Sequence, residues 1–367
     1  LGACQAQMSE KSSILKNRLD SLFKVEHQAK RFDGTVVIGT KDAVIYSQAW
    51  GLANRVWDIP LEPEHRFDIC SLNKSFVAAL MLKAEEEGKL SLNDPLVDHL
   101  KDYTYTGHFD SNITLHQMLS HTSGLPDYEQ VAPELYKDWG RAFKRKHFSS
   151  ASYVDFISQL SVKGKPEGQF YYSNFAYHLL MIILEDVYQM PFAELLKVKI
   201  TRPLSMDRTF SPISNETVFK QVAEGYNYEK KTDSWKRNQF IDMSSGRRIF
   251  STAFDLYLWA KALDSPGILS EKSRDLMFRN HTKAINPDIS YGYGWAVHDG
   301  QKSYRMGNLG IDRKYIIHGG STEGFKSMLI NIEQGQYIIS FLANTGDQTN
   351  EIRLAQQIVA ILIDAEG

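Results

Sequence analysis

The spacing of apolar and polar residues changes twice along this chain and divides it into three regions. In residues 9–31, apolar side chains recur every three to four positions among charged ones, which predicts an amphipathic helix. Two short runs rich in β-branched and aromatic residues follow at 34–40 and 43–50. Lys41 and Asp42 separate the two runs, and this arrangement predicts a β-hairpin.

Helical spacing dominates the middle of the chain. Residues 67–88 predict a short extended approach and then a helix, because apolar residues recur at helical spacing and Gly88 is typical of the position after a helix end. Mostly helical signals, interrupted by loops containing Pro and Gly, continue to about residue 287. The further helices predicted in this region cover residues 115–119, 152–160, 174–188, 192–199 and 252–263.

Strand signals return towards the end of the chain. A turn is predicted at residues 333–336, between two of the four runs rich in β-forming residues. The last element is predicted to be a helix over residues 350–363, with Thr349 as its N-cap. The four β-rich runs cover residues 293–297, 314–317, 325–332 and 337–342.

The order of these signals predicts an α/β (α+β) fold. The early hairpin and the late strands can pair in one antiparallel sheet, flanked by the terminal helices, with a mostly helical domain inserted between them. We therefore assign residues 9–68 and 288–367 to one discontinuous α/β sheet domain. Residues 69–287 form the predicted, mostly helical domain that carries the candidate nucleophile.

Composition and charge exclude several classes of protein. The 42 basic and 44 acidic residues give a formal net charge of −2, so no excess positive charge is available to bind nucleic acid or an anionic membrane. Two cysteines, Cys4 and Cys70, are too few for a disulfide framework or a four-ligand zinc site. The 11 histidines show no metal-ligand spacing. We therefore expect no metal, no cofactor and no nucleic-acid partner.

The first residues bear on where the protein acts. No segment reaches the roughly eighteen apolar residues that a membrane span needs. Leu1-Gly2-Ala3-Cys4 is similar to a lipobox, which predicts export to the periplasm or cell envelope with Cys4 as a candidate lipid anchor. Cys4-Gln5-Ala6 also fit the end of an ordinary secretory signal, and the remaining alternative is a terminus without meaning. Residues before Met8 are left out of the fold prediction.

Most widespread catalytic motifs are absent from the sequence, including phosphate-binding loops, dinucleotide fingerprints, HExxH and GxSxG. The chain does contain Ser71-Leu72-Asn73-Lys74 at the start of a predicted helix. Residues three apart share one helix face, so the Ser71 hydroxyl can meet the Lys74 amine. A serine nucleophile needs a base, and lysine can serve when burial and a helix N-terminus lower its pKa.

Alone, this pair is far more typical of a turn on a surface helix, but two further motifs strengthen it. Tyr172-Ser173-Asn174 opens the predicted helix at 174–188, and a phenol and an amide two residues apart can face one cleft from such a turn. His318-Gly319-Gly320 ends a β-rich run, and its glycines allow a ligand or another backbone to approach closely.

The three motifs, in this order, resemble those of the serine β-lactamase and penicillin-binding-protein superfamily. The likeness is greatest to its class C-like branch, with DD-peptidases and β-lactamase-related esterases, and covers roughly residues 34–345. It implies a β-lactamase-like fold with the active site in a cleft between the two domains. Further segments that carry the resemblance are residues 85–95, 113–126 (with HTSG-L-P), 251–256, 291–295 and 318–325.

The resemblance also implies a role for each motif residue. Ser71 would be the nucleophile that forms an acyl-enzyme, while Lys74 and Tyr172 would share the proton transfer from Ser71 to the leaving group. Asn174 would hydrogen-bond the substrate or Lys74. The backbone N–H groups of Ser71 and Ser321 would form the oxyanion hole. The substrate-binding edge opposite the nucleophile would consist of His318, Gly319, Gly320 and Ser321.

The third motif departs from the family pattern. His318 stands where β-lactamases and peptidases usually carry lysine, and Gly319 where they carry serine or threonine. The loss of a fixed positive charge and a hydroxyl donor weakens the case for a substrate with a carboxylate, such as a penicillin. His318 can still act if it is protonated, or as a neutral N–H donor. Arg247 and Arg248 are the candidates for replacing the missing charge.

Three neighbouring residues have simpler interpretations. Cys70, next to Ser71, is expected to be a buried apolar side chain rather than the nucleophile. His121 is expected to stabilise its loop through a hydrogen bond. Tyr171 lacks the Y-x-N spacing of Tyr172.

Together these features favour a serine hydrolase that acts through an acyl-enzyme on a small-molecule or peptide substrate, including peptidoglycan-derived ones. An ester, an amide or a D-amino acid peptide is favoured over a β-lactam because of His318 and Gly319. A true β-lactamase or a penicillin-binding DD-carboxypeptidase is the first alternative. A catalytically silent protein that binds cell-wall fragments is the alternative from another class.

Overall fold

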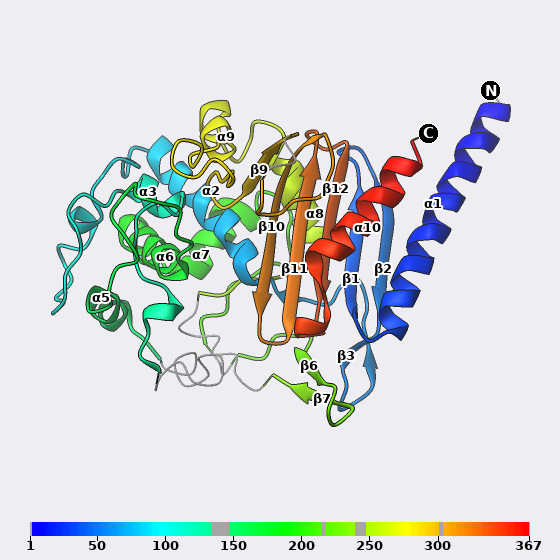
Figure 1. Ribbon diagram of the computed structural model, residues 1–367, viewed down its shortest axis with the longest axis horizontal. Coiled ribbons are helices and arrows are strands. Elements are labelled where there is room, and N and C mark those ends of the chain that lie inside the picture. The colour runs from blue at the N-terminus through cyan, green and yellow to red at the C-terminus, as the bar shows by residue number, and fades with distance from the viewer. Residues whose placement is uncertain (1, 134–146, 215–216, 239–246, 301–303, 367) are drawn as a thin grey trace.

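The computed structural model describes residues 2–133, 147–214, 217–238, 247–300 and 304–366, with side chains from residue 11 onward. Its centre is a six-stranded antiparallel sheet in the order β2-β1-β12-β11-β10-β9 (Figure 1). The predicted antiparallel sheet built from both ends of the chain is therefore confirmed. Its strands are β1 (Gly34–Gly39), β2 (Val44–Trp50), β9 (Ala296–Asp299), β10 (Lys314–Thr322), β11 (Phe325–Ile332) and β12 (Tyr337–Ala343).

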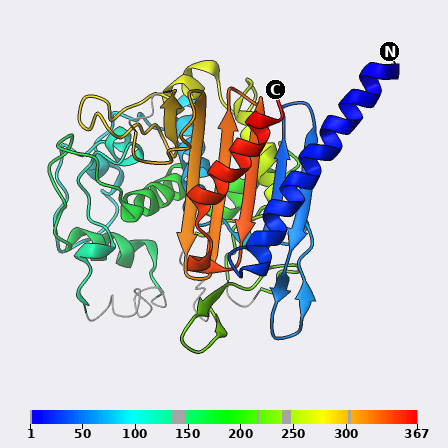
Figure 2. The ribbon, with the colours of Figure 1, turned by 45° about the vertical axis from the view of Figure 1, so that its right-hand side comes forward.

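Helices cover both faces of this sheet. The terminal helices α1 (Gly2–Gln28) and α10 (Glu351–Asp364) pack side by side on one face, and Figure 2 shows them in front of the strands. Helix α8 (Ala253–Leu263) packs against β12, β1 and β11 on the other face. Apolar side chains such as Phe23 and Phe341 fill the space beneath the terminal helices. The predicted flanking of the sheet by terminal helices is thus confirmed.

A mostly helical region stands beside the sheet, at the left of Figure 1. Helix α2 (Asn73–Glu86) runs through its core and packs against α6 (Asn174–Tyr188) and α9 (Glu271–Met277). Because α2 is apolar on nearly every face, it is buried almost all round. The remaining helices are α3 (Leu115–Leu119), α5 (Ser150–Ser158) and α7 (Phe192–Leu196).

Several boundaries differ from the sequence-based expectations. The final helix is capped by the Asn350 side chain, which accepts from the N–H of Arg353, and not by Thr349, whose hydroxyl donates to the Arg31 carbonyl instead. Strand β10 continues to Thr322 rather than ending at residue 317. The region predicted as helical also contains a hairpin of β6 (Tyr226–Glu229) and β7 (Ser234–Arg237), and it contains β8 (Phe250–Ser251). Strand β8 pairs with β5 (Phe67–Asp68), which lies in the predicted extended approach to α2. A short ribbon of β3 (Leu52–Asn54) and β4 (Ile59–Pro60) follows β2.

The boundaries of the two predicted domains stay a prediction, and α8 shows that one helix from within residues 69–287 packs on the sheet. No helix among the described residues is long and apolar enough to cross a membrane. Cys4 lies in the first turns of α1, where side chains are outside the described part of the structure.

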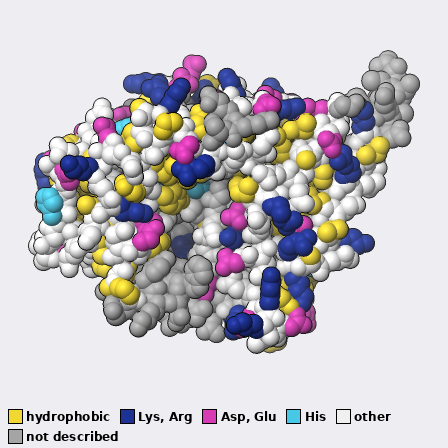
Figure 3. Space-filling model, viewed as in Figure 1, with side chains coloured by type: hydrophobic (Ala, Val, Ile, Leu, Met, Phe, Trp, Pro, Cys, Tyr) yellow, Lys and Arg dark blue, Asp and Glu magenta, His cyan; other side chains and the backbone are white. Residues whose placement is uncertain are grey.

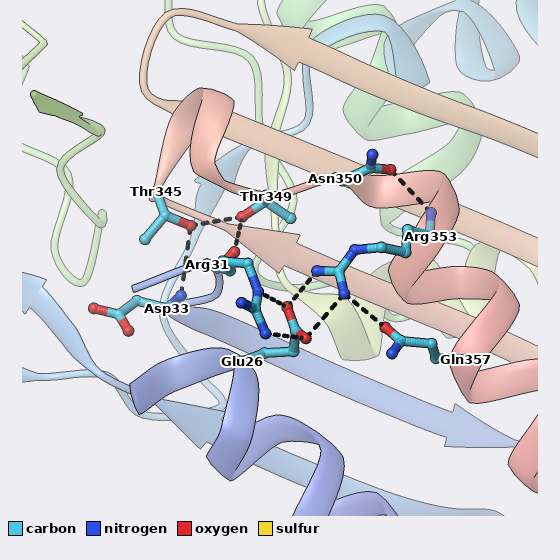
Figure 4. A network of polar contacts seen from close by, with 8 residues as sticks. All are labelled: Glu26, Arg31, Asp33, Thr345, Thr349, Asn350, Arg353 and Gln357. Carbon is cyan, nitrogen blue, oxygen red and sulfur yellow. Dashed lines mark hydrogen bonds and ion pairs between the residues drawn. The ribbon is translucent and has the colours of Figure 1, made fainter. Parts of the chain in front are cut away.

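One buried carboxylate ties the two terminal helices together (Figure 4). Glu26 of α1, whose side chain is 3% exposed, accepts hydrogen bonds from both Arg31 and Arg353. Burial raises the pKa of Glu26, but the hydrogen bonds and charges of the two arginines outweigh burial and lower the pKa overall. Glu26 therefore stays ionised while it is buried, because the two arginines compensate its charge.

We expect either Arg31 or Arg353 alone to compensate the buried charge of Glu26. Replacing either with alanine should cost about 1 kcal/mol in the free energy of unfolding, because the other arginine still neutralises Glu26. The double variant Arg31→Ala/Arg353→Ala should cost about 3 kcal/mol or more, since a buried carboxylate is then left without a counter-ion. Urea unfolding measures all three variants. Arg18→Ala, which removes only the exposed pair with Asp364 between the same helices, is the control and should change little. Strictly additive losses would contradict the shared-carboxylate interpretation.

Candidate active site

Ser71 lies in a tight 3₁₀ turn, Cys70–Leu72, that leads directly into α2. Cys70 adopts a left-handed backbone conformation with φ of 53°, which is uncommon for a residue with a side chain. The buried Asp68 side chain stabilises this turn, because its Oδ1 accepts a hydrogen bond of 2.8 Å from the Cys70 N–H. The turn presents Ser71 half-buried at the N-terminal end of α2.

Lys74 is buried beneath Ser71 on the first turn of α2. Its Nζ lies 3.4 Å from the Ser71 Oγ and donates a hydrogen bond of 2.8 Å to the Asn174 Oδ1. The rings of Tyr172 and Tyr177 lie 4.8 and 5.5 Å from the same nitrogen. Burial lowers the pKa of Lys74 to about 8, against the opposing charge of Asp127. A fraction of roughly one tenth of Lys74 is therefore the neutral amine at pH 7, the form that can accept a proton.

Tyr172 completes the group around Ser71. It shares a hydrogen bond with Ser71, and burial raises its pKa above the ordinary tyrosine value despite that bond. The phenol is therefore neutral at physiological pH and carries a proton that it can pass on. The structure thus brings together Ser71, Lys74, Tyr172 and Asn174, as the motif spacing predicted.

The Tyr-Ser-Asn segment is held by the loop that contains the HTSG-L-P sequence. The His121 Nδ1 accepts a hydrogen bond of 3.1 Å from the Ser173 N–H, and the Ser173 hydroxyl donates to the Pro126 carbonyl. Asp127 accepts from the backbone N–H of Asn174 through one oxygen and from its side-chain amide through the other. The hydrogen bond expected of His121 is therefore confirmed, and its partner is the Tyr-Ser-Asn segment.

His318 is buried at the far side of the site, and its hydrogen bonds do not suit it to bind an anion. Its Nδ1 lies 2.6 Å from the Gly319 carbonyl oxygen, which can only accept, so this nitrogen carries the proton. Its Nε2 lies 3.1 Å from the Tyr291 hydroxyl and accepts from it. Burial, with the nearby charge of Lys74, lowers the pKa of His318 to about 3. His318 is therefore a neutral ring with both nitrogens engaged inside the protein.

The glycines of the third motif let β10 approach the nucleophile turn. A Cβ atom on Gly320 would lie 2.7 Å from both the Cys70 Cβ and the Ile69 carbonyl oxygen, and 2.4 Å from the Ser327 Oγ. Gly319 faces the other side of the sheet, where a Cβ atom would meet nothing closer than 3.2 Å. Ser321 follows directly and is exposed at the end of β10. Figure 3 shows the surface hollowed where this edge of the sheet meets the helical region.

The two candidate replacement charges occupy different places. Arg248 pairs with Asp68, the residue that braces the nucleophile turn. Arg247 pairs with Glu185 in the C-terminal half of α6 and donates to Ser150. Both guanidinium groups are thus engaged by carboxylates. Within the described ranges, no cluster of His, Cys, Asp and Glu side chains could hold a metal ion.

Two site residues were missed by the sequence analysis. Asp127 directly follows the HTSG-L-P segment, and this position was the available signal. Asp68 lies three residues before Ser71, but no spacing rule connects a carboxylate there with the backbone of a turn.

Cys70 proves to be half-buried, and burial raises its pKa well above the ordinary thiol value, which agrees with an inert side chain.

Comparison with known proteins gives a consistent result. A family model described as Beta-lactamase matches residues 19–362. The chain is 25% identical over 348 residues to penicillin-binding protein 4* of Bacillus subtilis (strain 168), covering 91% of this chain and 73% of that protein. It is 24% identical over 345 residues to protein flp of Staphylococcus aureus (strain N315), and it spans 64% of the length of that relative.

The fold is also similar to that of solved structures. D-amino acid amidase from Ochrobactrum anthropi SV3 superposes with a TM-score of 0.76 at 20% identity, covering 98% of this chain and 100% of that chain. At this identity the likeness establishes the fold, which is the β-lactamase-like arrangement predicted from the sequence.

Gly320→Ala should force β10 away from the nucleophile turn. The added methyl group meets backbone and buried side-chain atoms that cannot move freely, so we expect the free energy of unfolding to fall by about 1–3 kcal/mol. Gly319→Ala adds the same group on the adjacent residue, where only the flexible end of Met328 is near, and should change stability little. Thermal and urea unfolding of the pair measure the difference. Equal stability of the two variants would contradict the close approach.

His318→Asn should make the protein less sensitive to acid. In the unfolded chain His318 binds a proton below about pH 6.5, whereas in the folded protein it does so only near pH 3. The unfolded state therefore binds more protons between these values, and stability falls as the pH falls through them. Between pH 7 and 5, the variant should lose about 2 kcal/mol less than the wild type in urea unfolding. Parallel curves for the two proteins would mean that His318 is protonated equally in both states.

Proposed function

This chain belongs to the beta-lactamase family and is a serine hydrolase of that family, and we propose that it hydrolyses an uncharged ester or amide through an acyl-enzyme on Ser71. The observation that carries the preference is the state of His318. A neutral ring with both nitrogens engaged offers no positive charge and no free N–H to a carboxylate. The binding edge therefore suits an acyl group without a carboxylate better than a β-lactam.

In the first half of the reaction, the Ser71 Oγ attacks the carbonyl carbon of the substrate while its proton passes to the neutral Lys74 amine, directly or through Tyr172. The carbonyl electrons move onto oxygen, where the backbone N–H groups of Ser71 and Ser321 would stabilise the charge. When the carbonyl reforms, the bond to the leaving group breaks. The leaving group takes the proton that Ser71 gave up, and Lys74 returns to the amine.

In the second half, water replaces the leaving group. A water molecule attacks the ester carbon of the acyl-enzyme and gives its proton to the same Lys74–Tyr172 pair. The bond between the carbonyl carbon and the Ser71 Oγ breaks as the acid is released, and the proton returns to Ser71. The pair therefore serves as base and then acid in each half, and the protein ends unchanged.

A D-amino acid amide or peptide is the amide substrate that the comparisons favour. A solved structure with the same fold is a D-amino acid amidase, and a curated relative is named a penicillin-binding protein. The relative that is named a penicillin-binding protein supports a DD-carboxypeptidase as the alternative function. That alternative requires a positive group for the terminal carboxylate of the peptide. Arg248 lies beside the nucleophile turn, but it would have to exchange its pairing with Asp68 for the substrate.

Ser71→Ala should abolish turnover. Without the hydroxyl, no acyl-enzyme forms, so hydrolysis of a p-nitrophenyl ester should fall by at least about a thousandfold. Intact-protein mass spectrometry should show one fluorophosphonate adduct on the wild type and none on the variant. Cys70→Ala is the control on the adjacent residue and should retain the adduct. Unchanged turnover by Ser71→Ala would refute the proposed mechanism.

The substrate preference has its own test. Wild-type kcat/KM for an activated ester and for a D-amino acid amide should both exceed that for nitrocefin, because only nitrocefin presents a carboxylate to the neutral His318 edge. Nitrocefin turnover of about 10 s⁻¹ or more would indicate a working β-lactamase instead.

A further inference from the structure

We propose that Asp127 is a positioning residue for the general base: it turns the Asn174 amide so that its carbonyl oxygen faces Lys74, and it places a carboxylate on the other side of that amide. The inference rests on the proposed function, because it takes Lys74 as the group that receives the Ser71 proton. It gives a role to a residue that belongs to none of the three sequence motifs.

The geometry supports this role at two atoms. Asp127 is 6% exposed and accepts two hydrogen bonds from Asn174. The Asp127 Oδ1 lies 3.0 Å from the Asn174 backbone nitrogen, and the Asp127 Oδ2 lies 3.1 Å from the Asn174 Nδ2. The opposite end of the same amide, Oδ1, accepts the 2.8 Å hydrogen bond from Lys74. Asn174 therefore stands as a bridge between a carboxylate and an amine.

An asparagine bridge of this kind has two orientations, and only one of them works. In the other, the Asn174 Nδ2 would face the Lys74 ammonium, which places donor against donor, and the amide oxygen would face a carboxylate. An ionised carboxylate accepts hydrogen bonds and donates none, so it selects the working orientation. A neutral amide at position 127 can either donate or accept, and would not select it.

The charge of Asp127 acts on Lys74 as well. It raises the pKa of Lys74, against the larger effect of burial. Burial in turn raises the pKa of Asp127 to about 6, although the Asn174 N–H and the charges of Lys74 and Lys163 lower it. The other groups that face Asp127 are the carboxylate of Glu129 and the neutral phenols of Tyr153 and Tyr172. Removing the Asp127 charge should therefore release the Lys74 proton at a lower pH.

The test is the pH dependence of Ser71 labelling by a fluorophosphonate, which needs no knowledge of the natural substrate. In the wild type the rate should rise with pH through a midpoint near 8, as Lys74 becomes the neutral amine. In Asp127→Asn the high-pH plateau should fall about tenfold or more, because Asn174 is no longer held in one orientation. The midpoint should move to lower pH by about one unit, because the negative charge is gone.

The matched control is Glu129→Gln, two residues further along. It removes one negative charge near Asp127, but the Glu129 side chain is 65% exposed and pairs with Lys163. Solvent and salt screen that charge, so both the plateau and the midpoint should stay close to the wild-type values.

Two further variants separate positioning from general damage to the fold. Asp127→Glu keeps the charge but displaces the carboxylate, so the plateau should fall while the midpoint stays near that of the wild type. In an Asn174→Ala background, Asp127→Asn should cost little more in the plateau, because the bridge is already absent. Thermal unfolding checks that each variant is folded.

The outcomes are distinct. A folded Asp127→Asn protein with an unmoved midpoint, or an Asp127→Glu protein whose midpoint also moves to acid, would overturn the proposal. Fully additive losses with Asn174→Ala would overturn the positioning role. Failure of the reagent to label wild-type Ser71 at any pH would instead refute the proposed function.

Discussion

The burial of the Lys74 ammonium is the constraint on which this site depends. A charged amine removed from water needs compensation, and here it comes from one amide oxygen, two aromatic rings and a carboxylate one residue further away. The amide oxygen and the two rings come from the start of α6 and the residues just before it, and the carboxylate comes from the loop that contains Asp127. Both segments have to be in place before Lys74 can be buried without great cost. The arrangement of α2, α6 and the loop around Asp127 can be understood as the way the chain meets that requirement, and the lowered pKa is its chemical result.

The sheet contributes the other wall of the site through close contact rather than through charge. Strand β10 passes so near the Ser71 turn that Gly320 has no room for a side chain. His318, two residues earlier, is turned inward and neutralised by burial. The same strand therefore lies against the Ser71 turn, and its His318 adds no charge to the site.

The sequence alone was sufficient for the elements whose signal is local. The motif serine, lysine, tyrosine and asparagine could be grouped because their ordered motifs resemble those of a known superfamily, and α6 begins and ends where the spacing predicted. Asp127 could not be assigned because its role depends on a contact with a residue 47 positions away. The full length of β10 was missed because its glycines weaken the local strand signal, and pairing with β11 outweighs it. Thr349 looked like a cap, but its hydroxyl serves the chain end of α1 instead.

The pairing of β1 with β12 has a consequence for the order in which the protein can fold. These neighbours at the middle of the sheet, such as Val36 and Phe341, come from opposite ends of the chain. During synthesis β1 and β2 are made first and have no partner on their inner edge until almost the last residues emerge. Contacts between such distant segments form slowly, because the intervening chain has to be ordered before they are made. Until then the edge of β1 that later pairs with β12 is unpaired. The newly made chain therefore has to be kept from pairing at this edge with strands of other chains.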